Sequence, residues 1–379
     1  MKIASVVGAR PNFIKLAPIH KAVSTVADHT IIHTGQHYDY ELSEIFFKEF
    51  SLPKPNYHLD VGSGTPGFQI GEMIKRLEKV FLDHINNKFD LVLVYGDTNS
   101  TFAGALAART SGIKVGHIES VLRSYDRRMP EETNRILTDH TSDYLFAPTQ
   151  TAVKNLEREQ VFGKIIYTGD VAVEIVRDAV QISSKSSVLR DLQLLPNSYI
   201  LFTMHRAENT DSKENLLSVI RAFEALAEKE LEEGRQQTRI VFPVHPRTAN
   251  LLQGKNMYER LKMSKNIFVI KPVGYMDFIK LMKNAKKIIT DSGGVQKEAY
   301  LLSVPCITIR KSTEWVETVN EGWNILTDTD TYKIVKAASE WMPMPAPVSN
   351  HHKSNPQKPI FGDGKTSQIM KDFVGSLGI

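Results

Sequence analysis

The sequence predicts an α/β protein made of two Rossmann-like, doubly wound halves that face a cleft. Short runs rich in β-branched residues alternate with longer amphipathic stretches, which is typical of βαβ units with a parallel sheet. The apolar runs are nearly continuous, as expected for strands that are covered on both faces. A second series of alternating strands and helices follows the first along the chain. A length of 379 residues also exceeds what one compact domain usually needs.

The first domain is expected to comprise residues 1–169, with its boundary at Gly169-Asp170. Its expected strands are Ile3–Val7, Thr30–His33, Leu91–Tyr95, Lys114–His117, Tyr144–Ala147 and Ile165–Thr168. Its expected helices are Lys15–Val26, Glu41–Phe50, Gln69–Ile85 and Thr98–Arg109.

The second domain, residues 170–364, repeats the pattern. Its expected strands are Tyr199–Met204, Arg239–Pro243, Ile267–Ile270, Lys287–Thr290 and Cys306–Ile309. Its expected helices are Lys213–Lys229, Tyr275–Lys283 and Val295–Leu302. A last helix, Thr366–Val374 within residues 365–379, is expected to return to the first domain.

Composition argues against several classes of function. The net charge is only +4 and the basic residues are dispersed, so we expect no nucleic-acid partner. The one cysteine, Cys306, excludes an internal disulfide and a cysteine-based zinc site. No stretch approaches the roughly 20 apolar residues of a membrane span. The chain also starts directly in a strand-like pattern, so we expect a cytoplasmic protein. His351 and His352 are interpreted as loop residues, not metal ligands.

Ligands of doubly wound domains bind at the carboxyl ends of the strands. Asp291-Ser292-Gly293-Gly294 follows the expected strand Lys287–Thr290 and opens a helix. The two glycines expose backbone to phosphate oxygens, and the helix start adds free N–H groups and the positive end of its dipole. Glu298, in the second turn, is suited to ribose hydroxyls. An ordinary glycine turn is the alternative, and the position after a strand favours a diphosphate.

A second candidate anion site follows the first strand. Gly8 permits a tight turn, and Pro11 suits the first turn of a helix. Arg10 then lies beside the free N–H groups of that helix start, and Lys15 lies on the same face as Pro11. A plain strand–turn–helix with two solvated cations explains the motif about as well.

Three carboxylates follow strands or open a helix in the first half: Asp97, Glu119 and Glu131. Taken singly, Asp97 fits a helix cap, and Glu131 with Arg135 fits a surface ion pair. Together, three acids near cations suit removal of a proton from carbon. Like charges at close range raise each other's pKa, which prepares one group as acid and another as base.

Two histidines of the second half also follow strands. His205 comes after Tyr199–Met204, and His245 comes after Arg239–Pro243. Both are candidates to donate a hydrogen bond to phosphate. A structural, hydrogen-bonded histidine is the alternative for each.

These motifs occur in one order along the chain, and together they resemble the non-hydrolysing UDP-N-acetylglucosamine 2-epimerases over essentially its whole length. The matching segments are Gly8-Ala9-Arg10-Pro11 with Lys15, Thr34-Gly35-Gln36-His37, Gly96-Asp97-Thr98, His117-Ile118-Glu119, Leu122-Arg123-Ser124, Pro130-Glu131-Glu132, Asn134-Arg135, Met204-His205-Arg206-Ala207-Glu208-Asn209, His245-Pro246, Asp291-Ser292-Gly293-Gly294 and Gly362-Asp363-Gly364.

The resemblance implies a glycosyltransferase-B-like fold, a homodimer, and interconversion of UDP-GlcNAc and UDP-ManNAc through 2-acetamidoglucal, without NAD or metal. The site residues that it implies fall into three groups. Those for proton transfer are Asp97, Glu119 and Glu131; those for the sugar and leaving group are Lys15, Arg135 and His205; those for UDP are Arg10, Ser292, Gly293 and Glu298. Gly294, His245 and Arg310 are further candidates for binding substrate.

The chain departs from the family pattern at three places. Val121 stands where the family has glycine, and a positive φ there would strain a valine. Trp315 replaces an arginine that contacts phosphate in bacterial members, a role for which Arg310 is a candidate substitute. Asp39 and Glu44 replace glutamines of a second UDP-GlcNAc site, so we expect that site to be absent or changed.

Four alternative functions share this frame. They are an epimerase of a related UDP-sugar (a 2,3-diacetamido or uronic acid form), a hydrolysing epimerase that releases free ManNAc, a glycosyltransferase, and a UDP-sugar binder with impaired catalysis. A glycosyltransferase would need an acceptor groove and would not need three acids. The valine at position 121, in place of the family's glycine, is the reason to consider a binder with impaired catalysis.

Overall fold

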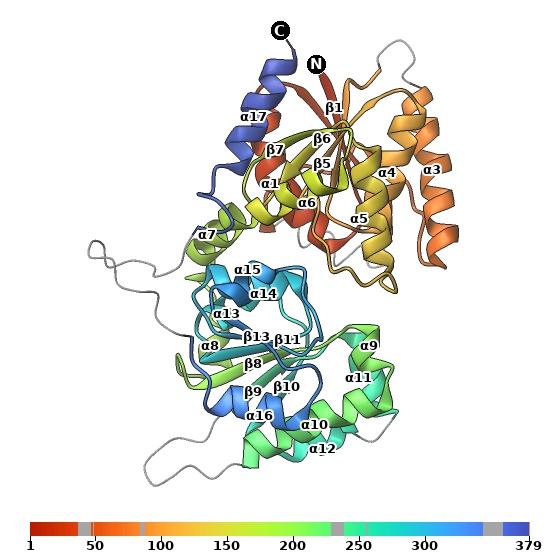
Figure 1. Ribbon diagram of the computed structural model, residues 1–379. Coiled ribbons are helices and arrows are strands. Elements are labelled where there is room, and N and C mark those ends of the chain that lie inside the picture. The colour runs from red at the N-terminus through yellow and green to blue at the C-terminus, as the bar shows by residue number, and fades with distance from the viewer. Residues whose placement is uncertain are drawn as a thin grey trace, which may run out of the picture. The chain divides into compact units, whose positions relative to one another are not determined.

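The computed structural model describes residues 1–36, 47, 49–83, 88–228, 239–254, 257–343 and 359–378, without the side chains of Arg10, Pro11 and Arg247. The chain forms two compact units, one of Met1–Ile175 with Pro359–Ile379 and one of Val176–Lys358. Each unit contains one parallel sheet with helices packed on it (Figure 1). The predicted α/β class with two Rossmann-like domains is therefore confirmed.

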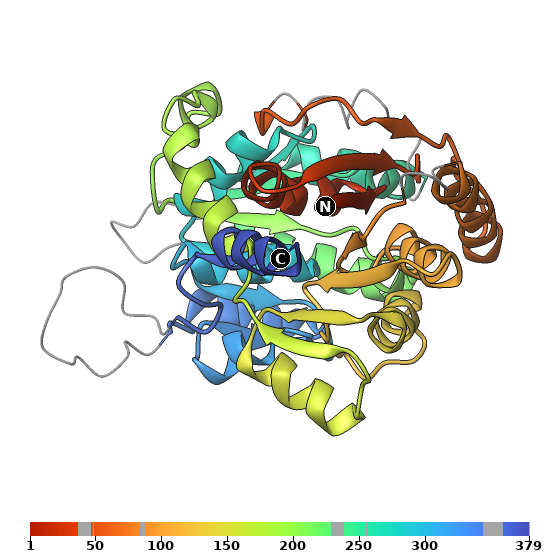
Figure 2. The same ribbon diagram turned by 90° about the horizontal axis from the view of Figure 1, so that it is seen from above.

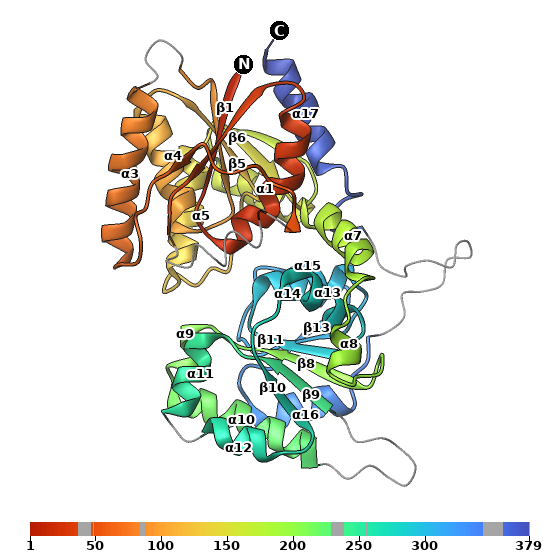
Figure 3. The ribbon, with the colours of Figure 1, turned by 180° about the vertical axis from the view of Figure 1, so that it is seen from behind.

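The first unit has a seven-stranded sheet in the order β3-β2-β1-β4-β5-β6-β7. Its strands are β1 Lys2–Val7, β2 Asp28–His33, β3 Tyr57–His58, β4 Leu91–Tyr95, β5 Lys114–Ile118, β6 Tyr144–Ala147 and β7 Lys164–Tyr167. Its helices are α1 Arg10–Val23, α3 Pro66–Leu82, α4 Asn99–Thr110, α5 Pro130–Thr141, α6 Gln150–Glu159 and α17 Thr366–Leu377. Helix α17 packs beside α1 (Figures 1 and 3), so both ends of the chain lie in this unit (Figure 2).

The second unit has a six-stranded sheet in the order β10-β9-β8-β11-β12-β13. Its strands are β8 Tyr199–Thr203, β9 Arg239–Pro243, β10 Ile267–Ile270, β11 Lys287–Thr290, β12 Cys306–Thr308 and β13 Asn324–Leu326. Its helices are α8 Val188–Asp191, α9 Ala207–Thr210, α10 Lys213–Glu228, α11 Pro246–Gln253, α12 Met257–Met263, α13 Tyr275–Lys283, α14 Gly293–Leu301, α15 Val316–Asn320 and α16 Thr331–Ser339. Helix α7, Ala172–Ser183, runs across the boundary between the units.

Each sheet has a point where the strand order reverses, and ligands of doubly wound folds bind there. In the first unit this point lies between β1 and β4, which end at Val7 and Tyr95. In the second it lies between β8 and β11, which end at Thr203 and Thr290. The candidate residues that directly follow these four strands therefore sit where the topology favours a site.

The strands form because their apolar runs are buried on both faces. All five residues of β4 are buried, and helices α3 and α4 pack on the same core through Met73, Leu77 and Ala103. The expected helix Glu41–Phe50 falls mostly outside the described residues, as do His37, Asp39, Glu44, His351 and His352. No helix in the described part of the chain combines the length and the hydrophobicity that crossing a membrane requires.

Candidate functional site

Lys15 and Glu119 form an ion pair in the first unit. Lys15 comes from the second turn of α1, and Glu119 directly follows β5. The Lys15 side chain is 16% exposed and that of Glu119 is 7% exposed, so the pair is shielded from water. Gly96 leaves room for it, because a Cβ at that position would lie 2.9 Å from Lys15 Nζ. The expected cation beside the expected acid is therefore present.

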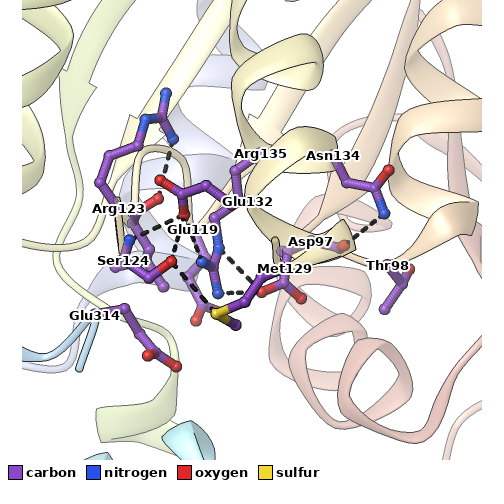
Figure 4. Close-up of polar contacts among 12 residues, drawn as sticks. Asp97, Thr98, Glu119, Arg123, Ser124, Met129, Glu132, Asn134, Arg135 and Glu314 are labelled. Atoms are coloured by element: carbon purple, nitrogen blue, oxygen red, sulfur yellow. Dashed lines mark hydrogen bonds and ion pairs between the residues drawn. The ribbon is translucent and has the colours of Figure 1, made fainter. Parts of the chain in front are cut away.

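Asp97 and Arg135 form a second pair of acid and base. Arg135, on α5, donates from Nη2 and Nε to Asp97 Oδ2, at 2.6 and 3.1 Å (Figure 4). Asp97 itself does not cap α4. The cap is Thr98, whose hydroxyl accepts from Thr101 N, so the interpretation of Asp97 as a helix cap is wrong. This leaves the Asp97 carboxylate for Arg135, and it is about one third exposed.

Helix α5 carries two neighbouring glutamates with different surroundings. Glu131 is exposed in the first turn, whereas Glu132 is buried. Glu132 accepts from Ser124 N and Oγ, both at 2.9 Å, and from Arg135 Nη1 at 3.0 Å (Figure 4). It also accepts from Tyr125 N at 3.0 Å. Glu132 was not predicted as a site residue, although it shares a helical face with Arg135 and Asp139 and all three are buried.

Val121 adopts the backbone conformation that favours glycine. Its φ is 57°, and Glu119, two residues earlier, has φ 62°. The valine is buried and packs with Leu145, Ala147, Ala152 and Leu156. A left-handed conformation costs a non-glycine residue about 1–2 kcal/mol, and β-branching makes it rarer still. The loop that carries Glu119 therefore holds backbone strain, which the side chain's packing offsets.

The side chain of Asn12, in the first turn of α1, bonds backbone groups at the start of the helix. Asn12 Oδ1 accepts from Ala9 N at 3.2 Å and from Gly8 N at 3.5 Å, and Asn12 Nδ2 donates to Tyr95 O at 2.8 Å. Asn12 thus engages the N–H of the N-cap residue Ala9, which lies at the helix start expected to receive an anion. The side chain of Arg10 lies outside the described part of the structure.

In the second unit, Asp291 follows β11 and is fully buried. It accepts from the backbone N–H of His205 and of Arg206, the latter at 3.0 Å, and from Asn209 Nδ2 at 3.2 Å. His205 Nδ1 also lies 3.3 Å from Asp291 Oδ1. Burial alone would raise the pKa of Asp291, but these hydrogen bonds and the nearby His205 outweigh it and hold the pKa below its usual value. Asp291 thus joins the ends of β8 and β11.

The next three residues begin α14 as predicted. Ser292 is the N-cap, and its hydroxyl oxygen accepts from Val295 N at 3.5 Å. Gly293 is needed for a steric reason, because a Cβ there would lie 2.0 Å from Glu314 Oε1. Gly294 is exposed. The start of α14 carries the positive end of the helix dipole, and the Glu314 carboxylate lies beside Gly293.

Arg310 and Trp315 line the same end of α14. Arg310 is buried and donates to Glu314 Oε2 from Nη1 at 2.8 Å. The Trp315 indole nitrogen lies 3.4 Å from the Cβ position of Gly293, and Lys297 Nζ lies 4.4 Å from the centre of a Trp315 ring. The Trp315 indole therefore lies beside Gly293 and also stacks with the Lys297 ammonium, which comes from α14 itself.

The remaining candidates lie at the same edge of the second sheet or one turn into α14. His205 and His245 have ring centroids 6.5 Å apart, and both are exposed. Glu298 is half-buried and accepts from the Tyr275 hydroxyl at 2.9 Å. Within the described ranges, no three His, Cys, Asp or Glu side chains are grouped so as to hold a metal ion.

The chain is similar to known proteins over its whole length. A family model described as UDP-N-acetylglucosamine 2-epimerase matches residues 21–375. The chain is 52% identical over 379 residues to a UDP-N-acetylglucosamine 2-epimerase homolog of Methanococcus maripaludis, covering 100% of both chains. It is 40% identical over 382 residues to the UDP-2,3-diacetamido-2,3-dideoxy-D-glucuronate 2-epimerase of Pseudomonas aeruginosa, again covering 100% of both. The solved structure of Methanocaldococcus jannaschii UDP-GlcNAc 2-epimerase in complex with UDP-GlcNAc and UDP matches with a TM-score of 0.87 and 42% identity, over 99% of this chain and 100% of that one. The chain therefore belongs to the UDP-N-acetylglucosamine 2-epimerase family, and its two Rossmann-like units are of the glycosyltransferase-B-like type.

Proposed function

We propose that the chain is a non-hydrolysing epimerase that interconverts UDP-GlcNAc and UDP-ManNAc, without a redox cofactor or metal. One observation carries the proposal: two carboxylates at strand ends, Asp97 and Glu119, are each paired with a basic side chain, Arg135 and Lys15. A carboxylate can act as the base that takes a proton from carbon, and the cation beside it can stabilise negative charge that develops on the substrate.

The proposed reaction has two steps. A carboxylate takes the proton from sugar C2, the C2–H electron pair forms the C1=C2 double bond, and the C1–O bond breaks as UDP leaves with its electron pair. The products of this step are 2-acetamidoglucal and UDP. An acid then protonates C2 on the opposite face, and a UDP oxygen adds back to C1. We assign the proton transfers to Asp97, Glu119 and Glu131.

The leaving diphosphate needs stabilisation as its charge develops. We assign this to the start of α14, with Ser292, Gly293 and Gly294, assisted by His205, His245 and Arg310. Glu298 is assigned to the ribose hydroxyls, with Tyr275 orienting its carboxylate. Lys15 and Arg135 supply positive charge near the sugar, and Arg10 is assigned to UDP.

A related UDP-sugar is the second candidate substrate. The observation that favours it is the 40% identity, over the full chain, to an epimerase named for UDP-2,3-diacetamido-2,3-dideoxy-D-glucuronate. The same two-step chemistry at C2 would apply to that sugar.

Product analysis by proton NMR tests the assignment. The chain is incubated separately with UDP-GlcNAc and with the 2,3-diacetamido glucuronate form, and the Glu119→Gln variant serves as the inactive control. We expect UDP-ManNAc from UDP-GlcNAc. Free ManNAc with UDP would identify a hydrolysing enzyme. Turnover of the uronate form alone would transfer the assignment to that sugar, and binding of both without turnover would overturn the proposal.

A further inference from the structure

We propose that the buried, hydrogen-bonded pair of His117 and Asp139 fixes the Gly96-Asp97 turn and so positions the Asp97 carboxylate. His117 is a positioning residue in this proposal, because it acts on the backbone before Asp97 and not on the substrate. The catalytic consequence rests on the proposed function, whereas the structural consequence does not.

The pair joins three elements of the first unit. His117 lies on β5 and Asp139 on α5, and both side chains are fully buried. His117 Nδ1 lies 2.7 Å from Asp139 Oδ1, and its Nε2 lies 2.7 Å from the carbonyl oxygen of Gly96, which follows β4. One imidazole therefore connects α5 to the turn between β4 and α4.

The partners determine which ring nitrogen donates to the turn. A carbonyl oxygen only accepts, so Nε2 carries the hydrogen that bonds Gly96. Asp139 lies on the other side of the ring and also accepts from Arg123 Nη2 at 2.7 Å. His117 therefore donates to the Gly96 carbonyl while its other nitrogen is held by a carboxylate that is itself anchored.

Arg123 connects the pair to a further carboxylate. It donates from Nε and Nη2 to Glu159, at 2.8 and 2.7 Å, as well as to Asp139. Asp139 is therefore held by Arg123 on one side and by His117 on the other. Buried polar groups of this kind are tolerated because they are hydrogen-bonded, and loss of one partner leaves the other unsatisfied.

Hydrogen bonds hold the backbone of Gly96 and of Asp97. Gly96 has φ +66°, and its N–H donates to Ile118 O at 3.0 Å. Its carbonyl accepts from His117, so residues of β5 bond both the N–H and the carbonyl of Gly96. The Asp97 carbonyl accepts from Asn134 Nδ2 at 3.1 Å (Figure 4). The two carbonyls that flank the Asp97 Cα are therefore anchored to β5 and α5. Loss of the hydrogen bond from His117 leaves the Gly96 carbonyl without this anchor.

Two near-isosteric substitutions separate the two bonds of His117. The amide nitrogen of Asn occupies the place of Nδ1, so His117→Asn keeps the bond to Asp139 and loses the bond to Gly96. The amide nitrogen of Gln occupies the place of Nε2, so His117→Gln keeps the bond to Gly96 and loses the bond to Asp139. The proposal predicts that Asn disturbs Asp97 more than Gln does, although Gln is the variant that leaves Asp139 without its histidine.

The test combines hydrogen–deuterium exchange with kinetics. We expect His117→Asn to speed amide exchange in the peptide that contains Gly96 and Asp97, and to lower kcat by about 10- to 100-fold with the Kd for UDP unchanged. His117→Gln should keep both the amide exchange rate and kcat close to those of the wild-type chain. His29→Gln serves as the matched control, because His29 is a buried histidine of the same unit with two hydrogen-bonded partners, Ser5 and His20. It should leave exchange at Gly96 unchanged.

The outcomes separate this inference from the proposed function. If the wild-type chain does not epimerise but His117→Asn alone loosens the Gly96-Asp97 peptide, the positioning holds and the function fails. If the wild-type chain is active and the Asn and Gln variants match in both exchange and kcat, the positioning is overturned and the function stands. Equal loosening throughout the unit in both variants would reduce His117 to a general stabiliser and also overturn the inference.

Discussion

Arg135 donates two hydrogen bonds, of 2.6 and 3.1 Å, to one carboxylate oxygen of Asp97, and its third group donates to Glu132 at 3.0 Å. The guanidinium thus links the residue that follows β4 to the buried face of α5. Its side chain is only 4% exposed, so the geometry does not depend on solvent.

We predict that Arg135→Lys lowers the rate of epimerisation by about 100-fold, because an ammonium cannot reproduce the planar fork that holds both carboxylates. NMR of UDP-GlcNAc turnover measures this. The control is Arg109→Lys, whose arginine pairs with Asp143 at 2.9 Å on the surface and is 58% exposed. A control as slow as Arg135→Lys would show a general effect on folding in place of a role for the fork.

Val121 gives a prediction about stability. At φ 57° a Cβ is strained, so Val121→Gly should be more stable than Val121→Ala by about 1 kcal/mol in chemical denaturation, although both lose the packing of valine. Val153, on α6 beside the same cluster, provides the opposite case, since in a helix Gly should be less stable than Ala by about 1 kcal/mol. The same order at both positions would contradict strain at Val121.

The strain at Val121 also has a predicted kinetic effect. Val121→Gly restores the residue of the family pattern in the loop that carries Glu119, so we expect turnover to rise. Steady-state kinetics of the purified variant measures this. Equal or lower turnover would show that valine is tolerated in that loop.

Two buried histidines make stability depend on pH. Burial lowers the pKa of His29 to about 3 and that of His33 to about 4, with smaller contributions from His20 and His58. The unfolded chain therefore binds protons that the folded chain does not, below the ordinary histidine pKa of about 6.5. Stability is fully present above that pH and is lost as the pH falls towards 4 and 3.

Between pH 7 and pH 5, each of these two histidines should lower the free energy of unfolding by about 2 kcal/mol. Urea denaturation at the two pH values measures the difference, and His29→Gln should remove about half of the histidine contribution. A variant with the same pH dependence as the wild-type chain would contradict a neutral, buried His29.

Asp291 gives a prediction for the second unit. Asp291→Asn turns an acceptor of several N–H groups into a partial donor, so we expect a loss of about 2–3 kcal/mol of stability and weaker binding of UDP. Asp330→Asn is the control, because Asp330 caps α16 through Lys333 N at 2.9 Å and asparagine caps helices equally well. Calorimetry of UDP binding and thermal unfolding measure both effects. Unchanged UDP affinity in Asp291→Asn would contradict the assigned role of this helix start.

The fold was predictable because its strands are buried on both faces. Strands such as β4 and β11 appear in the sequence as short apolar runs, and their bounds match the expectation. The two-residue strand β3 and the three-residue strand β13 were missed, since so few residues carry no periodicity. Thr98 in place of Asp97 at the helix cap was also missed, because both residue types cap well.

The candidate site was predictable only where residues follow strands. This rule located Asp97, Glu119 and Asp291 at the sheet ends. It did not reveal Glu132 or Asp139, which act from inside α5, and it could not distinguish exposed Glu131 from its buried neighbour. Polar residues at helical spacing on a buried face are the pattern that would have identified them.

The central claim is removal of the C2 proton with loss of UDP, and solvent isotope incorporation tests it most directly. The chain is incubated with UDP-GlcNAc in D2O, and proton NMR follows the C2 position of both epimers. The account predicts deuterium at C2 of UDP-ManNAc and, as the reaction reverses, at C2 of UDP-GlcNAc. UDP-ManNAc that retains its C2 proton, or bound UDP-GlcNAc that never exchanges, would contradict it.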